Sequence, residues 1–200
     1  MGGKPDRGFS AYHAATRERG PRKTLLAALD AFAPAAGFAI DFGCGTGRDT
    51  VELLRRGWRV LAVDAEASAI AELAARSEAK AAAQRLETLA ARFETIALPP
   101  CDLVNSSFAL PLCGPADFPP LWERIGAALR PGGRVACQLF GPRDSWAARQ
   151  PPIAIHDRAT IQSLLAGFEV EMLDEEETDS VTPRGRQKHW HIFHVVARRQ

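Results

Sequence analysis

The sequence has almost no net charge, no closely spaced cysteine pair and no long apolar run. Its 25 Lys and Arg residues balance 24 Asp and Glu residues, which leaves a formal net charge of +1. A protein that binds nucleic acid or anionic lipid through charge alone needs a clustered basic surplus, so we expect neither partner. The four cysteines, Cys44, Cys101, Cys113 and Cys137, form no Cys-x-x-Cys pair. This spacing disfavours a zinc ribbon or a disulfide scaffold, and we expect no bound metal.

Apolar segments are short throughout the chain. No stretch approaches the roughly 18 consecutive apolar residues of a membrane-spanning helix. The opening sequence MGGKPDRGFSAYHAA contains no apolar core of a signal peptide, so we expect a cytoplasmic protein without a membrane partner. A hydrophobic content of 46% with little net charge excludes a disordered chain. The length predicts one domain over residues 1–200, as a monomer or homodimer, with residues 1–20 forming an arm or lid.

Short apolar runs of strand type alternate with amphipathic runs of helix type. The predicted strands cover residues 38–42, 58–64, 86–90, 102–107, 134–140, 168–175 and 189–199. The predicted helices cover residues 22–32, 46–56, 67–84, 119–129 and 157–166, the last with Thr160 as an early polar cap. This alternation predicts a parallel α/β sheet with right-handed crossovers. Only a polar loop, which includes the acidic run 174–179, separates the last two strands, so one of them is predicted to be antiparallel.

Three glycines, Gly43, Gly45 and Gly47, lie between the first strand and the helix that follows it. Glycine has no Cβ, so a backbone turn made from it can approach a ligand closely. The free N–H groups at the start of the helix favour a polar or anionic ligand group. The spacing is G-x-G-x-G, whereas the dinucleotide-binding fingerprint is G-x-G-x-x-G. The sequence therefore indicates a nucleotide-type site that differs from a typical NAD site.

Two acidic residues end the first two strands. Asp64 closes the second strand, 64 − 47 = 17 residues after Gly47. Ligands of open α/β sheets bind at the carboxyl ends of the strands, where a carboxylate can accept both hydrogen bonds of a ribose diol. The alternative is that Asp64 caps the following helix. Asp41, next to the end of the first strand, is interpreted as having a mixed role, bonding loop amides and lying under the amino group of a cofactor.

These motifs resemble those of the class I S-adenosylmethionine-dependent methyltransferases. The resemblance is carried by four segments along nearly the whole chain: AIDFGCGTGRDT, VLAVDAE, FETIALPPCDLVNSSFALPLC and LRPGGRVACQLFG. The run GCGTGRDTVELLRRGWRVLAVD is similar to the small tellurite- and thiopurine-type bacterial enzymes, which methylate small soft nucleophiles. The resemblance implies S-adenosyl-L-methionine as cofactor and a Rossmann-like three-layer sandwich. Its seven-stranded sheet would be mostly parallel, with the last strand antiparallel.

The resemblance also assigns residues to parts of the cofactor. Asp64 would hold the ribose hydroxyls, and Ala65 would lie against the adenine. Glu94 would pair with the adenine amino group beside the backbone N–H of Phe93, although the usual pattern is Asp after a small residue. The methionine part would contact Gly43, Cys44, Gly45, Gly47, Asn105 and Ser106, with Asp41 beneath and either Arg22 or Arg17 on the carboxylate. Cys44 is interpreted as a small residue that suits the turn, not as a nucleophile.

The acceptor site is expected where the N-terminal arm, the turn after the fifth strand and the start of the last strand meet. The substrate-binding candidates are Tyr12, Trp146, Lys188 and Trp190. His189 is the candidate catalytic base, with a hydrogen-bonded structural histidine as the alternative, and His194 is expected to be structural. Arg22 could equally be a solvated arginine. Soft sulfur or selenium acceptors can react as anions without any base.

Three functions fit these observations. The first is methyl transfer to a small-molecule nucleophile by in-line displacement. The second is an NAD(P)-dependent oxidoreductase, which the glycine spacing and the LRPGG segment disfavour. The third is a protein that binds S-adenosylmethionine without catalysis, because no compulsory catalytic residue is evident. No Asn-Pro-Pro-aromatic motif follows the fourth strand, which disfavours the exocyclic amines of DNA bases as acceptors.

Overall fold

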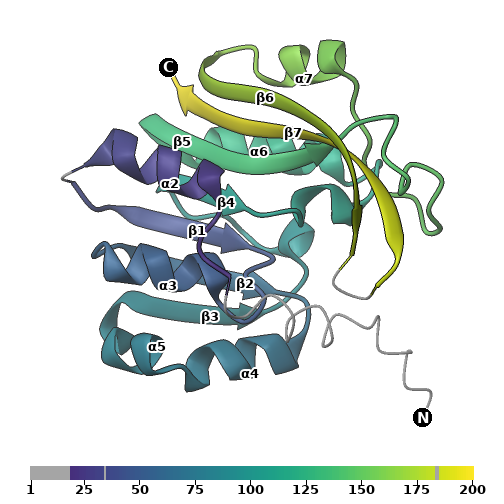
Figure 1. Ribbon diagram of the computed structural model, residues 1–200. Coiled ribbons are helices and arrows are strands. Elements are labelled where there is room, and N and C mark those ends of the chain that lie inside the picture. Colours follow the sequence, from purple (N-terminus) through teal and green to yellow (C-terminus); the bar gives the residue numbers. More distant parts are fainter. Residues whose placement is uncertain (1–18, 34, 183–184) are drawn as a thin grey trace.

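A single mixed sheet of seven strands organises the protein (Figure 1). The computed structural model describes residues 19–33, 35–182 and 185–200. The strands are β1 (Phe38–Phe42), β2 (Arg59–Asp64), β3 (Leu86–Ala90), β4 (Cys101–Ser106), β5 (Leu129–Phe140), β6 (Phe168–Val181) and β7 (Gln187–Arg199). Their order is β3-β2-β1-β4-β5-β7-β6. Only β7 runs antiparallel to its neighbours, which confirms the predicted topology.

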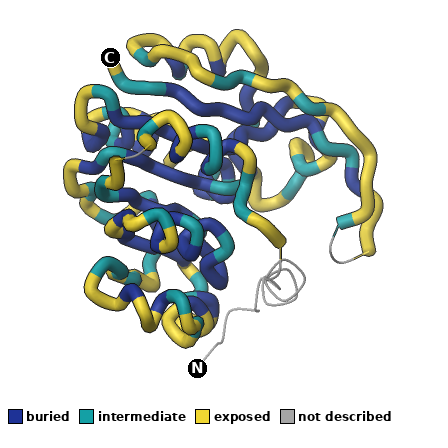
Figure 2. Tube along the Cα trace, turned by 60° about the vertical axis from the view of Figure 1, so that its left-hand side comes forward, coloured by how far each residue is buried: buried dark blue, intermediate teal, exposed yellow. Residues whose placement is uncertain are grey.

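Helices cover both faces of the sheet and complete the predicted three layers. One face carries α2 (Lys23–Phe32), α3 (Arg48–Arg55), α4 (Ala67–Ala75) and α5 (Ser77–Ala81), and the other carries α6 (Phe118–Ala128) and α7 (Arg158–Leu164). Short 3₁₀ turns are η1 (Ala83–Arg85), η2 (Phe93–Thr95) and η3 (Leu110–Cys113). Each face has its own apolar cluster, because alternate residues of a strand point to opposite sides. Figure 2 shows the buried strands between layers whose outer surfaces are exposed.

The strand order places a binding position at the carboxyl edge of the sheet. The chain runs from β1 outward through β2 to β3, and then returns to β4 on the other side of β1. The connections from β1 and β4 therefore leave in opposite directions, and ligands of open α/β sheets bind at the carboxyl ends of the strands at such a position. The glycine turn follows β1 at this position. In the part of the chain that the structure describes, no helix is long and apolar enough to cross a membrane.

Three local predictions were wrong. The helix predicted over residues 67–84 is divided, because Arg76 is extended (ψ 144°) and separates α4 from α5. High alanine content favours helix at every position, so propensity carries no sign of this break. The cap of α7 is Asp157, whose side chain accepts from the backbone N–H of Thr160. The acidic run 174–179 lies within β6 and is not a loop.

A long β6–β7 ribbon, residues 175–181 and 187–191, projects past the carboxyl edge of the sheet (Figure 1). The last β7 residue paired with β5 is Ile192, opposite Phe140, whereas β6 and β7 pair through to Val181 and Gln187. The acidic residues of β6 can form a strand because ion pairs with cationic side chains neutralise their charge. The ion pairs are Glu169–Arg198, Glu171–Arg134, Asp174–Lys23, Glu175–Arg143, Glu175–Arg158, Glu177–Arg143 and, when the histidines are protonated, Glu175–His191, Glu176–His194, Glu177–His189 and Asp179–His189.

Candidate functional site

The glycine turn between β1 and α3 adopts a backbone that other residues rarely tolerate. Gly43, Gly45 and Gly47 have φ values of 65°, 54° and 89°. A Cβ on Gly43 would lie 2.2 Å from the Cβ of Ala109, and one on Gly47 would lie 2.3 Å from Cδ1 of Leu73. Both glycines are therefore required by close packing as well as by conformation. Ala109 follows β4, so its closeness to Gly43 places the segment after β4 directly against the turn.

Hydrogen bonds fix the turn to the end of β2. The N–H groups of Gly43 and Cys44 both donate to the carbonyl of Val63, at 2.8 and 3.1 Å. Asp64 accepts from Gly45 N–H through Oδ2 (2.8 Å) and from Glu66 N–H through Oδ1 (2.9 Å). The cap position of α4 is Glu66, so Asp64 is not the helix cap. Each Asp64 oxygen retains acceptor capacity beyond its one backbone bond, which a ribose diol could use.

Cys44 and Ala65 lie beside this anchor with different exposure. Ala65 is exposed next to Asp64. Cys44 is buried, and burial, together with the nearby carboxylates of Asp41 and Asp64, raises the pKa of its thiol well above the usual value. A thiol is a poor nucleophile compared with a thiolate. The structure thus agrees with a small packing residue at position 44.

A buried acidic cluster lies beneath the turn. Asp41 accepts hydrogen bonds from Thr50 Oγ1 (2.6 Å) and Asn105 Nδ2 (2.8 Å). The same amide group reaches Asp49 Oδ2 (3.3 Å), which also accepts from the hydroxyl of Ser107. Burial, reinforced by the charge of Asp49, raises the pKa of Asp41 to about 7. Asp41 is thus held by side chains of α3 and β4, whereas loop amides were expected.

Replacing Asp41 by Asn should change how stability depends on pH. A carboxyl whose folded pKa lies above its unfolded pKa stabilises the fold below the unfolded value, near 4, and this contribution is lost as pH rises through about 7. The side chain of Asn does not ionise, so it makes no pH-dependent contribution. We therefore expect Asp41→Asn to lower the free energy of unfolding at pH 4.5 and to become progressively less harmful toward pH 8. Urea unfolding at several pH values measures this, and a pH-independent difference would contradict the raised pKa.

Arg22 and Phe108 meet above the cluster. Arg22, at the start of α2, donates its backbone N–H to Asp49 Oδ1 (3.0 Å), and its guanidinium lies 4.4 Å from the centre of the Phe108 ring. Its Nε is buried and forms no hydrogen bond to the described residues. Phe108 has a φ of 61°, and its N–H donates to Gln138 Oε1 (3.2 Å), while Gln138 Nε2 donates to Thr24 (2.8 Å). A strained aromatic residue at this edge is typical of a functional site.

The adenine-side candidates follow β3. Ala91 N–H donates to the carbonyl of Asp64 (2.9 Å), so the segment after β3 starts beside that residue. Phe93 is buried against Phe42, with ring centres 5.2 Å apart. Glu94 forms an ion pair with Arg92, and Arg124 donates to the Glu94 carbonyl (2.7 Å). The structure therefore brings Glu94 to the same edge as Asp64, with its carboxylate already held by an arginine.

Asn105 and Ser106 end β4 in fully buried positions. Asn105 Oδ1 and Ser106 Oγ are buried and form no hydrogen bond within the described ranges. Buried polar atoms are nearly always paired, because leaving one unpaired costs about 1–3 kcal/mol. Adjacent residues of a strand point to opposite faces, and the contacts of Asn105 with Asp41 and Asp49 place its unpaired oxygen on the face of the acidic cluster, as expected for a position that binds a polar ligand group.

The predicted acceptor-site residues of β7 lie on two different faces of the strand. Trp190 faces Phe108 and Trp146, with ring centres 6.0 and 5.9 Å apart. Lys188 points to the same side, but its ammonium is buried against Trp146 and Trp190 and is paired with Asp144. This pair joins β7 to the loop after β5, which leaves Trp146 and Trp190, not Lys188, available to a ligand.

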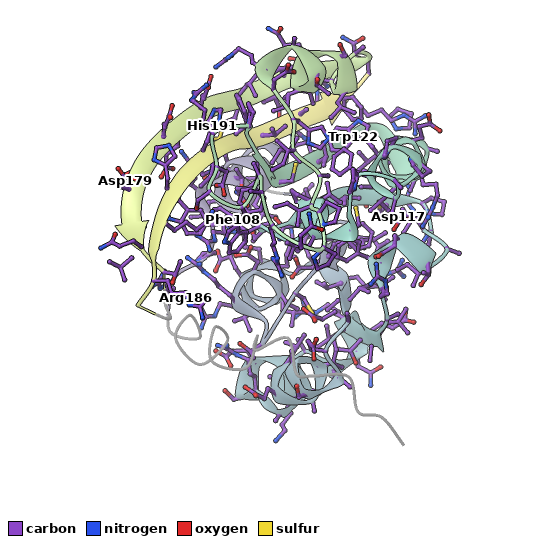
Figure 3. All side chains as sticks on the ribbon, turned by 90° about the vertical axis from the view of Figure 1, so that its right-hand side faces the viewer. Phe108, Asp117, Trp122, Asp179, Arg186 and His191 are labelled. Atoms are coloured by element: carbon purple, nitrogen blue, oxygen red, sulfur yellow. The ribbon has the colours of Figure 1, made fainter. Side chains whose placement is uncertain are left out.

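His189 lies on the opposite face of the ribbon. Its ring nitrogens contact Asp179 (2.8 Å) and Glu177 (3.0 Å), and these hydrogen bonds raise its pKa. Figure 3 shows Asp179 on the outer ribbon, while Phe108 lies in the body of the protein. This position argues against His189 as the base of a site that contains Phe108. Tyr12 and Arg17 lie outside the described residues.

Phe108, Asp49, Ser107 and Gln138 were missed by sequence reasoning. Ser107 ends the predicted fourth strand and Phe108 directly follows it, and this position is the signal that could have found them. Asp49 and Gln138 lie inside a helix and a strand, where the sequence gives no sign of their partners. Among the described residues, no group of three or more His, Cys, Asp or Glu side chains could hold a metal ion.

Residues 39–133, which contain the glycine turn, Asp64 and the buried acidic cluster, match a protein family described as "Methyltransferase domain". This segment of the chain is therefore similar to a methyltransferase domain. The predicted resemblance to S-adenosylmethionine-dependent methyltransferases is thereby confirmed at the level of domain and fold. The sequence matches no curated protein.

Several solved structures share the fold of this chain. TehB from Haemophilus influenzae superposes with a TM-score of 0.76 at 16% identity, over 92% of this chain, which spans only 64% of TehB. Magnesium protoporphyrin IX methyltransferase from Synechocystis PCC 6803, with bound SAM, gives 0.69 at 14% identity, over 98% and 92% of the two chains. The 1,6-didemethyltoxoflavin-N1-methyltransferase of Burkholderia thailandensis gives 0.60 at 18% identity, over 100% and 92%.

Proposed function

We propose that the protein transfers a methyl group from S-adenosyl-L-methionine to a small-molecule acceptor. The observation that carries this proposal is the glycine turn fixed to Asp64 at the carboxyl ends of β1 and β2, inside the segment that matches the methyltransferase family. The G-x-G-x-G spacing argues against the alternative of a nicotinamide cofactor. Two of the similar structures are methyltransferases named for a porphyrin and for a small heterocycle, which supports a small-molecule acceptor.

The buried polar atoms and the tight turn fit this cofactor. Asp64 would accept from the ribose hydroxyls, and Ala65, Phe93 and Glu94 would surround the adenine. The methionine part would lie against the glycine turn, with Arg22 offering its unpaired Nε to the carboxylate. Asn105 Oδ1 would then accept from the methionine ammonium, and Ser106 Oγ would gain a partner. These assignments give the buried atoms the hydrogen bonds that they lack in the protein alone.

The sulfonium of the cofactor supplies an activated methyl group, so the protein's task is to align an acceptor and exclude water. Phe108, Trp146 and Trp190 form an apolar wall beside the glycine turn. The wall lies where β4, the loop after β5 and the start of β7 meet. We place the protein in the cytoplasm, as a monomer or homodimer without a nucleic-acid partner, in keeping with its small net charge.

Calorimetric titration with S-adenosylhomocysteine and with NADH tests the proposal. We expect S-adenosylhomocysteine to bind in the micromolar range and NADH to give no heat of binding. Incubation with labelled S-adenosyl-L-methionine and a bacterial metabolite extract should then place label in small molecules. Tight NADH binding would overturn the proposal. Binding of S-adenosylhomocysteine with no transfer to any acceptor would indicate a binding protein without catalysis.

A further inference from the structure

His194 is a buried histidine with one ring nitrogen engaged. It lies in β7 between Gln138 of β5 and Asp174 of β6, and only 6% of it is exposed. Its Nε2 lies 2.8 Å from Oε2 of Glu176. An ionised carboxylate can only accept, so Nε2 carries the hydrogen of this bond. Glu176 therefore fixes both the orientation of the ring and its tautomer.

The second ring nitrogen of His194 has no such partner. Nδ1 is buried and makes no hydrogen bond within the part of the chain that the structure describes. With the hydrogen on Nε2, a neutral ring holds a lone pair on Nδ1. The two nitrogens of an imidazole point in roughly opposite directions, so Nδ1 is directed away from Glu176. A carboxylate on one nitrogen and a free lone pair on the other is the arrangement of an oriented base.

Contacts connect His194 to the glycine turn through Phe108. The Phe108 ring lies edge-to-face with the His194 ring, with centres 6.5 Å apart. The next residue, Ala109, is the one that a Cβ on Gly43 would meet. Phe108 also contacts Arg22, Phe140 and Trp190. His194 is therefore one aromatic ring away from the cofactor turn, on the face of β7 that carries Trp190 and not on the face of His189.

We infer that His194, oriented by Glu176, is the general base of the acceptor site for acceptors whose accepting atom carries a proton. This inference rests on the proposed methyl transfer. Nδ1 takes the proton from the acceptor while the acceptor atom forms its bond to the methyl carbon and the carbon–sulfur bond breaks. S-adenosylhomocysteine leaves, and His194 returns the proton to water. Glu176 is a positioning residue in this scheme, because it acts through the histidine ring.

The surroundings of His194 favour its neutral form by lowering its pKa. Burial, opposed by the hydrogen bond to Glu176, lowers the pKa of His194 below its usual value. Lys23 of α2 lowers it further, whereas the carboxylates of Glu176 and Asp174 raise it. A lowered pKa moves the protonation of the ring to more acidic pH than for a free histidine. The rate with a protonated acceptor should therefore fall on the acid side as His194 gains a proton.

Two acceptor probes distinguish a base from a structural histidine. Catechol keeps its hydroxyl proton at pH 7.5, whereas the sulfur of thionitrobenzoate is already an anion. We expect His194→Asn to lower kcat with catechol about 100-fold and to change kcat with thionitrobenzoate less than threefold. Glu176→Gln should lower kcat with catechol less and move the acid limb of its pH profile to lower pH. The matched control, His189→Asn, should change neither rate. Equal losses with both probes, or no loss with catechol, would overturn the inference.

A measurement without an acceptor keeps the inference separate from the proposed function. Nitrogen-15 NMR of histidine-labelled protein saturated with S-adenosylhomocysteine, assigned with His194→Asn, should show Nε2 protonated and Nδ1 bare at pH 7.5. A hydrogen on Nδ1 at that pH would overturn the inference even if methyl transfer is confirmed. Failure of wild-type protein to bind S-adenosylhomocysteine would instead contradict the proposed function. Unchanged S-adenosylhomocysteine affinity in His194→Asn shows that the variant folds.

Discussion

Replacing Asp64 by Ala should raise the dissociation constant for S-adenosylhomocysteine about 100-fold or more. The nearly buried carboxylate holds the N–H groups of Gly45 and Glu66, and we propose that it also accepts from the ribose. Hydrogen bonds to a charged group contribute about 1.5–3 kcal/mol each. Loss of the ribose bonds and of the anchor of the turn together therefore exceeds the roughly 2.7 kcal/mol of a 100-fold change. Calorimetric titration of the folded variant measures the effect.

Asp102 offers a matched control for this experiment. Its carboxylate also accepts from a backbone N–H, that of Phe38 at 2.8 Å, and it pairs with Arg130. It lies at the start of β4, at the amino edge of the sheet, away from the glycine turn. Asp102→Asn should therefore leave S-adenosylhomocysteine affinity within about twofold of wild type. If both variants lost affinity equally, the effect of Asp64 would be general destabilisation and not a contact to the ligand.

Replacing Gly43 by Ala should lower the free energy of unfolding by about 2–5 kcal/mol. A left-handed backbone costs an L-residue about 1–2 kcal/mol. The new Cβ would also lie 2.2 Å from the Cβ of Ala109, and relief of such overpacking typically costs a further 1–3 kcal/mol or so. The shift of the segment after β4 would carry Phe108 with it, so S-adenosylhomocysteine binding should weaken as well. Denaturant unfolding and calorimetry measure the two effects.

Gly132 separates the cost of conformation from the cost of the clash. It has a φ of 79°, similar to that of Gly43, but a Cβ built there meets nothing within 4 Å. Gly132→Ala should therefore cost only about 1–2 kcal/mol and leave ligand affinity unchanged. Equal destabilisation by Gly43→Ala and Gly132→Ala would show that the segment after β4 can move away from the new Cβ without loss of stability. The packing of Ala109 against the turn would then be loose.

The parts of the site that could be predicted from the sequence are those with a local signal. Gly43, Gly45 and Gly47 stand directly after an apolar run, and Asp64 closes the next one, so both positions follow from the order of elements. The seven strands were predicted for the same reason. The strand structure of residues 174–179 was not predicted, because a row of carboxylates normally indicates a solvated loop. Only the fold reveals the partners of this run, which are histidines of β7 and cations on α2, α7 and the loop after β5.

The acceptor side was harder to predict because it depends on contacts between distant segments. Alternation along the last strand placed Trp190 and His194 together on one side and His189 on the other, but it could not tell which side faces the site. The partner of Lys188 is Asp144, 188 − 144 = 44 residues earlier, and nothing local links the two. Arg22, Asp49 and Phe108 likewise come from three separate elements, and their meeting point is a property of the tertiary fold.

The charge of β6 has a consequence for how copies of the protein behave toward one another. β6 is one of the two edge strands of the sheet, β3 being the other, and an open strand edge is a template on which a second chain can add. Two copies meeting edge to edge through β6 would bring rows of carboxylates together, whose repulsion opposes pairing. The same side chains that pair with cations of their own chain therefore oppose the addition of a second copy at the β6 edge.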